Sequence, residues 1–281
     1  MPVGQTVERK GQMVISSTAN KQVKYVNALM KKAKMRREEG LFVAEGLRIC
    51  KEVPKGRLHT LYVSESFRKS PECLPLEEKA DRVEIATDPV FSAMSGTQTP
   101  QGVLALVRQY AYTWEQVSRA KGGGNPPAHL MVLEHLQDPG NLGTVFRAGE
   151  GAGVTGILMD VGTADIYNPK AIRSTMGSVL RVPFLYVEDL PGALKQLREK
   201  GVRLYASDLS AKRDYDQEGY QGDIGFLVGN EAGGLSSQAV SLAHAKIKVP
   251  MAGQVESLNA AVAASILMYE AARQRRAASR G

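Results

Sequence analysis

The stretch DPGNLGTVFRAGEGAG, residues 138–153, decides the fold of this chain together with two later stretches of similar construction. These are FLVGNEAGGLS, residues 226–236, and IKVPMAGQVESLNAAVAAS, residues 247–265. Each stretch has a hydrophobic strand directly before a loop rich in glycine or asparagine, and two of the loops lead into apolar helix patterns. Three such loops in one domain are typical of a single pocket at one edge of a parallel sheet.

The alternation of strands and helices continues on both sides of these loops. We expect strands at 129–135, 156–159, 202–207, 225–228 and 246–250, with helices at 142–151, at 190–200 and from about 257 onward. Short apolar runs that alternate with amphipathic helical runs indicate parallel βαβ units. The C-terminal half is therefore predicted to be a parallel α/β domain.

The N-terminal half predicts a smaller α/β domain. A helix is expected over residues 21–39, ended by Gly40, followed by strands at 41–44, 61–64, 83–86 and 103–109 and a possible short helix at 112–120. The run KGGGNPP at 121–127 combines flexible glycines with prolines that stop regular structure. We divide the chain into a flexible extension 1–15, an N-terminal domain 16–110, a linker 111–127 and a C-terminal domain 128–281.

Charge and cysteine content narrow the class of protein. The 281 residues carry a net charge of +7, which favours an anionic partner, nucleic acid first, although a basic enzyme without such a partner has the same charge. Only Cys50 and Cys73 are present, without metal-like spacing or a disulfide framework, so a reducing cytosol fits. The sequence contains no apolar run long enough to span a bilayer, and we expect a cytoplasmic protein.

Several familiar catalytic patterns are missing from the sequence. The glycines at 149–153 end a predicted helix, whereas a dinucleotide fingerprint opens one, and no Walker loop is present. The histidines show no metal-ligand spacing, and neither a G-x-S-x-G elbow nor a Cys–His pair stands out. The chemistry is therefore expected to need neither a metal nor a covalent nucleophile.

The three loops contain candidate functional residues, each with a structural alternative. Arg147, near the start of the helix after the first loop, is placed to bind a phosphate, or else to pair with Glu150 on the surface. Glu231 follows a strand end, where α/β sites hold working residues, or is a solvated loop carboxylate. Ser257 at the start of the last helix is a plausible N-cap.

The three stretches, in this order, resemble the motifs of the SpoU/TrmH branch of the SPOUT methyltransferases. The segment NPKAIRSTMGSVLRVP at 168–183 is similar to that family's intervening segment, and FVAEGLR at 42–48 and TPQGVLAL at 99–106 resemble the ribosomal-protein-L30e-like domain of many members. The resemblance covers roughly residues 16–276. It implies an N-terminal L30e-like α/β domain, a C-terminal SPOUT α/β domain with a deep trefoil knot around a parallel sheet, and a homodimer with active sites at the interface.

The resemblance also implies an activity and a set of site residues. The activity is S-adenosylmethionine-dependent 2′-O-methylation of a ribose in RNA, with ribosomal RNA (23S or another) favoured over transfer RNA. By motif position, the catalytic residues are Arg147, Asn141, Glu231, Ser257 and Asn259. The cofactor-binding residues implied are Leu227, Gly229, Asn230, Ile247, Val249, Met251, Ser257 and Leu258, and no metal is implied.

One residue departs from the family pattern. The second motif usually reads Asn-Glu-Gly, and Ala232 stands here in place of that glycine. An alanine held at positive φ is strained by about 1 kcal/mol or more. This departure keeps a catalytically silent RNA-binding protein open as the alternative function, whereas the missing fingerprint disfavours a nucleotide-dependent oxidoreductase.

Basic residues gather in the N-terminal helix and at the C-terminus. A stretch of the N-terminal helix without an acid before Glu38 is predicted to contact RNA phosphates, with an ordinary solvated helix face as the alternative. The predicted RNA-binding residues are Lys21, Lys24, Lys31, Lys32, Lys34, Arg36, Arg37 and Arg48. The C-terminal arginines Arg273, Arg275, Arg276 and Arg280 extend this set or belong to a disordered tail.

Overall fold

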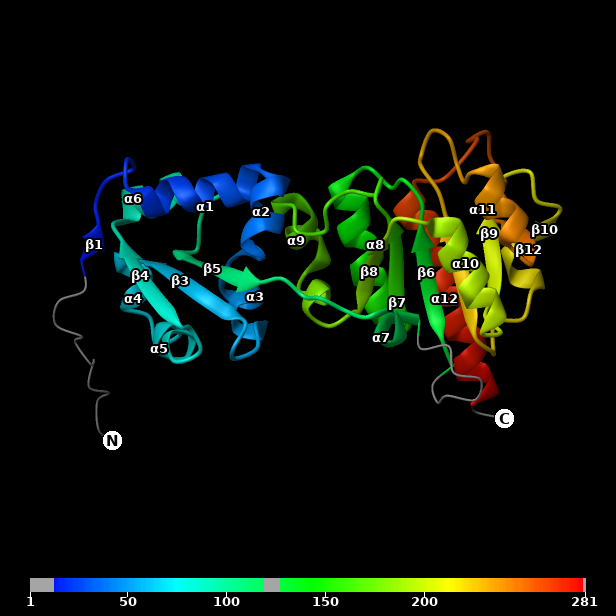
Figure 1. The fold of residues 1–281 in the computed structure, drawn as a ribbon, viewed down its shortest axis with the longest axis horizontal. Coiled ribbons are helices and arrows are strands. Elements are labelled where there is room, and N and C mark those ends of the chain that lie inside the picture. The colour runs from blue at the N-terminus through cyan, green and yellow to red at the C-terminus, as the bar shows by residue number, and fades with distance from the viewer. Residues whose placement is uncertain (1–12, 119–126, 280–281) are drawn as a thin grey trace. The chain divides into compact units, whose positions relative to one another are not determined.

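The computed structural model describes residues 13–118 and 127–279, and the chain divides into two compact units, residues 1–109 and 110–281 (Figure 1). Three parts of the sequence-based predictions lie outside the described residues. They are residues 1–12 of the expected extension, residues 119–126 of the expected linker, and Arg280. Within the described ranges, no helix is long and apolar enough to cross a membrane.

The first unit contains a mixed five-stranded sheet. Its strands are β1 (Val14–Ile15), β2 (Leu41–Glu45), β3 (Leu58–Ser64), β4 (Arg82–Ala86) and β5 (Val103–Arg108), in the order β1-β4-β3-β5-β2. β5 runs antiparallel to β2 and β3, whereas β1, β4 and β3 are parallel. Val14 and Ile15, assigned to the extension by the sequence, thus form an edge strand beside Ile85 and Ala86.

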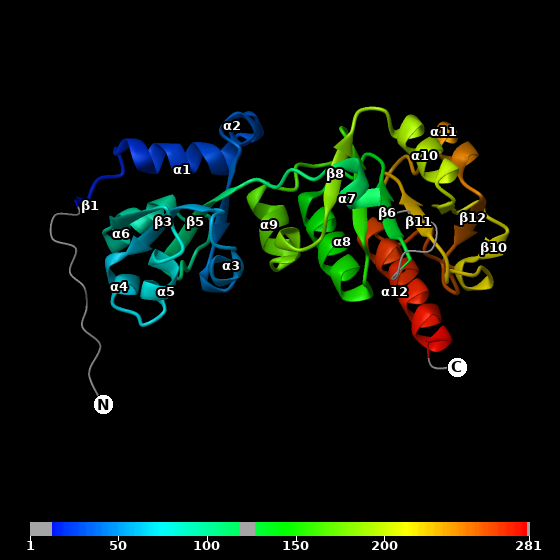
Figure 2. The same cartoon turned by 60° about the horizontal axis from the view of Figure 1, so that its bottom comes forward.

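Helices cover this sheet on both faces (Figure 2). α1 (Lys21–Lys31) and α6 (Asp88–Met94) pack their apolar side chains on one face, and α3 (Leu47–Glu52), α4 (Glu65–Arg68) and α5 (Cys73–Glu77) contact the strands from the other. The helix expected over 21–39 is two helices, because Lys32 adopts an extended conformation between α1 and α2 (Ala33–Glu39). Gly40 ends α2 with φ +62°, as predicted.

The second unit contains an all-parallel seven-stranded sheet. Its strands are β6 (His129–Leu133), β7 (Gly156–Asp160), β8 (Phe184–Val187), β9 (Arg203–Ser207), β10 (Arg213–Asp214), β11 (Ile224–Val228) and β12 (Ala245–Lys248). They lie in the order β10-β12-β9-β11-β6-β7-β8. β6 is therefore flanked by β11 and β7, and the C-terminal ends of these three strands meet at one edge.

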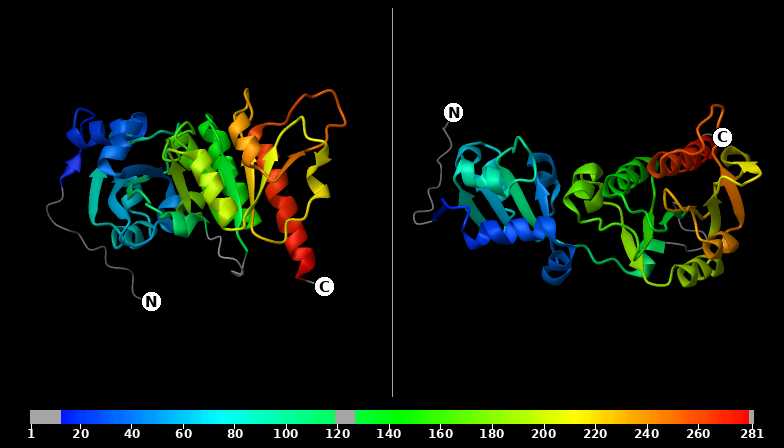
Figure 3. Two further views of the ribbon diagram at one scale, coloured as in Figure 1. Left: turned by 45° about the vertical axis from the view of Figure 1, so that its right-hand side comes forward. Right: turned by 90° about the horizontal axis from the view of Figure 1, so that it is seen from above.

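Two groups of helices enclose this sheet (Figure 3, right). α8 (Pro139–Ala152), α9 (Pro169–Thr175) and α12 (Ala260–Ala278) lie on one side, where α8 packs against both α9 and α12. α7 (Trp114–Ser118), α10 (Leu190–Glu199) and α11 (Ser237–Leu242) pack on the other side. Short 3₁₀ turns occupy Ser178–Leu180 and Tyr215–Gln217. The parallel α/β architecture predicted from the sequence is confirmed.

Two helix starts differ from the prediction. α8 begins at Pro139, three residues earlier than expected, because the Asp138 carboxylate caps it by accepting from the Asn141 N–H at 2.8 Å. α12 begins at Ala260, where Asn259 rather than Ser257 caps the helix by accepting from the N–H groups of Ala261 and Val262. The interpretation of Ser257 as N-cap was wrong, since either residue type caps a helix and only the backbone path decides between them.

The connection between the units is held from both sides. Gln109 belongs to the first unit: its side-chain Nε2 donates to the carbonyls of Arg36 and Leu41. Tyr110 belongs to the second, since its N–H donates to Tyr167 Oη at 2.7 Å. Beyond it, Val117 of α7 is fully buried. Residues 111–118 of the expected linker are therefore packed on the second unit, because their aromatic side chains join its core.

Candidate functional site

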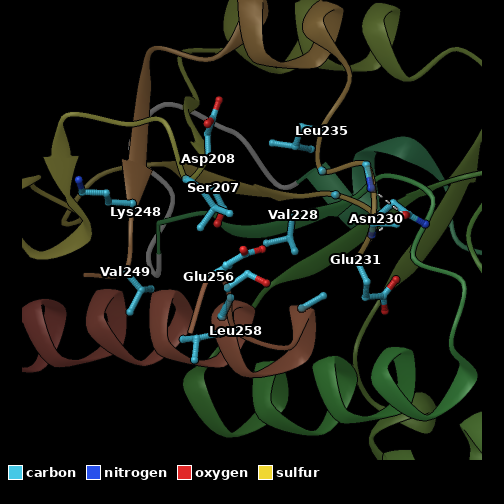
Figure 4. Close-up of a pocket in the computed structure, with 18 of the residues that line it drawn as sticks. Ser207, Asp208, Val228, Asn230, Glu231, Leu235, Lys248, Val249, Glu256 and Leu258 are labelled. Carbon is cyan, nitrogen blue, oxygen red and sulfur yellow. Dashed lines mark hydrogen bonds between the residues drawn. The ribbon is translucent and has the colours of Figure 1, made fainter. Parts of the chain in front are cut away.

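A cavity of about 520 Å³ opens at the C-terminal edge of β9, β11 and β12, within the size range of small-molecule sites (Figure 4). Segments that are far apart in the sequence line it: Ser207–Leu209 after β9, Val228–Leu235 after β11, and parts of 248–258 after β12. Ala260 and Ala263 of α12 complete the lining. Of the three loops predicted to form one pocket, the second and third thus line it, whereas the first loop, 138–143, does not.

The loop after β11 is folded tightly on itself. Asn230 Oδ1 accepts hydrogen bonds from the N–H groups of Ala232 and Gly233, and Gly234 adopts φ +65°. A side chain at Gly229 would lie 2.2 Å from the backbone of Gly234, so only glycine permits this turn. The backbone of this loop is therefore held in one compact conformation beside the cavity.

Ala232 does not adopt the positive φ that would strain an alanine. The only residues other than glycine with positive φ in the described ranges are His135 and Met176. The strain inferred from the departure at this position is therefore absent, and with it the structural reason for expecting a silent protein.

Six of the predicted cofactor-binding residues line the cavity, and two do not. Leu227 and Ile247 are fully buried inside β11 and β12 and contribute to the core beneath the cavity. The sequence did not single out the polar lining residues Ser207, Asp208, Lys248 and Glu256, although their positions at strand ends and in the third loop were the available signal. The lining residues that were predicted are Gly229, Asn230, Val249, Met251, Ser257 and Leu258.

Three predicted catalytic residues form one hydrogen-bonded chain beside the cavity. Asn141 Nδ2 donates to Glu231 Oε1 at 2.7 Å, and Asn259 Nδ2 donates to Asn141 Oδ1 at 3.1 Å. These residues come from the start of α8, the β11 loop and the N-cap of α12, so this chain joins all three sequence stretches. Asn141 is its centre, because it orients the Glu231 carboxylate on one side and is itself oriented by Asn259 on the other.

The start of α8 is braced by a second polar contact. Lys170 of α9 donates from Nζ to Asp138 Oδ2 at 2.6 Å, and this ammonium holds the pKa of the Asp138 carboxyl below its usual range. An ionised Asp138 is the better acceptor for the Asn141 N–H. The position of Asn141 thus depends on α9 as well as on its own helix.

Arg147 lies apart from this chain. It is an exposed residue in the middle of α8, so the expectation that it sits near the helix N-terminus was wrong, because α8 begins earlier than predicted. It is not paired with Glu150, whose carboxylate binds Arg181 and Ser178 instead. A helix places residues six apart about 240° around its axis, so Arg147 and Asn141 face different directions.

The predicted RNA-binding residues are mostly exposed, with one exception. Arg36 is 2 % exposed, and its Nη1 donates to the carbonyls of Leu29 and Met30, which lie in the last turn of α1. It therefore closes the C-terminus of α1, and its prediction as an RNA contact was wrong. Lys34 and Arg48 form exposed ion pairs with Glu38 and Glu52. The other exposed members are Lys21, Lys24, Lys31, Lys32 and Arg37.

The C-terminal arginines divide in the same way. Arg275 donates to the carbonyls of Tyr220, Ala128 and Gly222, so it ties α12 to the loops below the sheet. Arg273 pairs with Glu270 within α12. Arg276 is exposed on the same helix.

The lining of the cavity fits S-adenosylmethionine. Carboxylates of Asp208 and Glu256 suit the ligand's cationic groups, and the apolar side chains of Val228, Leu258 and Met251 suit its adenine and methylene carbons. Among the described residues, no group of three histidine, cysteine, aspartate or glutamate side chains is placed to hold a metal ion.

Comparison with known families assigns both units. Residues 128–269 match the SpoU rRNA Methylase family, and residues 20–105 match the MRM3-like substrate binding domain. An uncharacterised tRNA/rRNA methyltransferase of Synechocystis is 33% identical over 94% of this chain and 95% of its own length. The 23S rRNA (guanosine(2553)-2′-O)-methyltransferase of Bacillus subtilis is 31% identical over 91% of this chain and 97% of its own length.

Solved structures give the same result. The AdoMet-bound rRNA methyltransferase of Sinorhizobium meliloti superimposes with a TM-score of 0.82 and 28% identity, over 93% of this chain and 97% of that one. The SpoU methyltransferase AviRb of Streptomyces viridochromogenes, in complex with AdoMet, gives 0.80 and 26%, over 92% and 98%. The similarity therefore extends over both units and includes proteins that bind this cofactor.

Proposed function

Because the chain belongs to the SpoU rRNA methylase family, we propose that it methylates a ribose 2′-hydroxyl of 23S ribosomal RNA. The activity itself, S-adenosylmethionine-dependent 2′-O-methylation of RNA, follows from the family and its AdoMet-bound relatives. The choice of 23S RNA is supported by the named activity of the Bacillus subtilis relative. The observation that carries the proposal is the Asn141–Glu231–Asn259 chain at the rim of a cavity that fits the cofactor.

When bound, S-adenosylmethionine supplies a methyl group that its sulfonium has already activated. The protein then has to align the ribose hydroxyl and stabilise the negative charge that develops on its oxygen. Glu231, held by Asn141, is placed at the rim of the cavity to accept a hydrogen bond from a ribose hydroxyl. Tight folding of the Gly229–Gly234 turn keeps this carboxylate in place.

Arg147 acts in this proposal as a fixed positive charge. A guanidinium retains its proton above pH 12, so it does not serve as a general base. It binds the phosphate next to the target ribose and stabilises the developing alkoxide.

The position of Arg147 on an exposed face leads us to include the homodimer in the proposal. Tyr269 lies on the same surface, since its hydroxyl is 2.6 Å from where a side chain at Gly151, one turn beyond Arg147, would begin. Tyr269 and Val262 of α12 are 47% and 46% exposed, although both are large and apolar. A partner copy covering this face would bury them and bring its own Arg147 toward the site.

The trefoil knot and the cytoplasmic location remain predictions that follow from the family resemblance. A cytoplasmic location accords with ribosomal RNA as the substrate and with two buried, unpaired cysteines, Cys50 and Cys73.

The test uses unmodified 23S RNA transcribed in vitro, transfer RNA, and S-adenosylmethionine with a labelled methyl group. Transfer of label to 23S RNA, at one site resistant to alkaline cleavage, is the expected result, because a 2′-O-methyl group removes the nucleophile of that cleavage. Label on transfer RNA alone would contradict the substrate, and S-adenosylmethionine binding without transfer to either RNA would favour the silent RNA-binding protein.

A further inference from the structure

A histidine and an aspartate form a rigid pair next to the reaction site. His135 follows β6, Asp160 ends β7, and these strands are neighbours in the parallel sheet. His135 Nδ1 lies 2.5 Å from Asp160 Oδ2, and the His135 backbone N–H donates to Asp160 Oδ1 at 2.8 Å. The two oxygens of the Asp160 carboxylate thus contact the ring and the backbone of His135, and these two contacts hold the ring in position.

Several further features keep the imidazole in this position. Asp160 is buried, and its Oδ1 also accepts from Thr163 Oγ1 at 2.7 Å. The ring lies against Gly162, where a Cβ would be only 2.6 Å from His135 Cδ2. His135 itself has φ +56°, a conformation that is uncommon for residues other than glycine. Backbone strain of this kind persists where the surroundings fix it, often at a functional site.

The other ring nitrogen is available to a ligand. The His135 side chain is 59% exposed, whereas that of Asp160 is 7% exposed. In the described part of the chain, Nε2 has no hydrogen-bond partner. With Nδ1–H directed at the buried Asp160 carboxylate, the Nε2–H of a protonated ring is a charged donor directed away from Asp160.

Other charged and polar groups near the pair are engaged elsewhere. The Glu134 carboxylate accepts from the Ser236 N–H, and Asp138 is held by Lys170. Tyr186 of β8 donates from its hydroxyl to the Ala164 carbonyl. Asp160 is therefore the one acid that binds the imidazole among the residues described.

The pair is connected to the cavity. Asn230, which lines the cavity and precedes Glu231, donates from Nδ2 to the His135 carbonyl at 2.9 Å. His135 also lies three residues before Asp138, which caps the helix that carries Asn141. The backbone of His135 therefore lies beside the loop that carries Glu231.

We propose that His135, held by Asp160, binds a backbone phosphate of the RNA strand beside the methylated ribose. This inference rests on the proposed function, since it requires an RNA strand at the site. It adds a contact on the β6–β7 side of the site, separate from the cofactor cavity, in which a protonated ring donates from Nε2 to a phosphate oxygen.

The test measures filter binding of unmodified 23S RNA transcript, with S-adenosylmethionine present, from about 50 to about 400 mM KCl. His135→Asn is the main variant, because asparagine accepts positive φ more readily than most residues and carries no charge. The expected result near pH 6 is about tenfold weaker binding and a salt slope smaller by about 0.7, the value of one lost phosphate contact with a single strand.

Two further variants separate this role from a structural one. His135→Lys keeps a positive charge at this position and should restore the slope, provided thermal unfolding shows an intact fold. His244→Asn is the matched control: His244 lies before β12, at the opposite edge of the sheet, and its Nδ1 only accepts from the Leu204 N–H. Its slope should equal that of wild type.

The outcomes distinguish this inference from the proposed function. If wild type binds and methylates 23S RNA while His135→Asn keeps the same affinity and slope near pH 6, the phosphate contact is refuted and the proposed function stands. If wild type does not bind or methylate 23S RNA, the proposed function fails first, and the phosphate contact on this RNA fails with it.

Discussion

Replacing Asn141 tests the hydrogen-bonded chain at the centre of the site. Asn141→Ala removes one bond to an ionised carboxylate, from Nδ2 to Glu231 Oε1, and one neutral bond from Asn259. Bonds to charged groups contribute about 1.5–3 kcal/mol and neutral ones about 1 kcal/mol. Since Glu231 and Asn259 are exposed, the low end applies, and we expect a loss of about 2–3 kcal/mol. This corresponds to a decrease in kcat/KM of roughly 30- to 150-fold.

Asn141→Asp sharpens the test because it replaces the donor with a carboxylate of nearly the same shape. Two carboxylates in direct contact repel each other, and one of them is expected to take up a proton at a higher pH than usual. Asn141→Asp should therefore lose at least as much activity as Asn141→Ala near pH 8 and recover part of it as the pH falls toward 6.

The assay is methyl transfer to 23S RNA, with S-adenosylmethionine binding measured by calorimetry on the same proteins. Asn141 does not line the cavity, so the Kd for S-adenosylmethionine should change by less than about twofold while kcat/KM falls. Gln196→Ala, which removes an exposed amide from α10, is the matched control and should behave as wild type. Equal activity of wild type and Asn141→Ala, or a loss of cofactor binding that accounts for the whole effect, would refute the role assigned to Asn141.

Three other predictions concern charge. Arg147→Ala should lower the rate of methyl transfer by about 100- to 1000-fold, as when a transition-state donor is removed, whereas Arg147→Lys should keep measurable activity; an equal loss in both would contradict an electrostatic role. Lys31→Gln and Lys32→Gln should each reduce the salt slope of RNA binding by about 0.7 without changing stability. Arg36→Gln should instead lower the thermal unfolding temperature, because it removes the donor that binds the last carbonyls of α1. Unchanged slopes in the two lysine variants would contradict an RNA contact by α1 and α2. Burial, together with nearby Arg275, lowers the pKa of His129 from 6.5 to about 3, so the unfolded chain binds a proton below pH 6.5 that the folded chain does not accept until about pH 3. The contribution of His129 to the free energy of unfolding is complete above pH 6.5 and decreases by about 2 kcal/mol between pH 7 and pH 5. Urea unfolding of wild type and His129→Phe should therefore differ by that amount in its dependence on pH. Parallel pH curves for the two proteins would contradict the lowered pKa of His129.

Local patterns were sufficient to predict most of the longer strands and the three loops. The runs in β6 and β11 are entirely buried, and a continuous apolar run before a glycine-rich loop indicates such a strand without any tertiary knowledge. The glycines of the loops were also informative, because a tight turn requires them. At Gly229 the close approach of Gly234 leaves no room for a side chain. The resemblance to a family then indicated which polar residues of these loops belong to the catalytic and cofactor sites.

Features that depend on contacts between distant segments could not be predicted. Arg36 is buried because the chain breaks at Lys32, which lets the Arg36 guanidinium bind the end of α1. The amino-acid composition of this segment could not distinguish Arg36 from the exposed basic residues around it. The His135–Asp160 pair joins residues 25 apart and depends on the parallel register of β6 and β7. β8 was missed because its residues at 185–187 are only partly buried and lack a strict alternation.

We expect the junction between Gln109 and Tyr110 to restrict which riboses the catalytic unit can reach. Since consecutive residues are fastened to different units, rotation is concentrated in the bonds between them, and no slack length of chain separates the two. A long flexible tether would let the substrate-binding unit hold one RNA element while the catalytic unit sampled many riboses. Here the two anchored residues are joined by one planar peptide bond, so only ψ of Gln109 and φ of Tyr110 can turn between them. Inserting a few glycines after Gln109 should therefore broaden the set of methylated positions before it lowers the affinity for RNA.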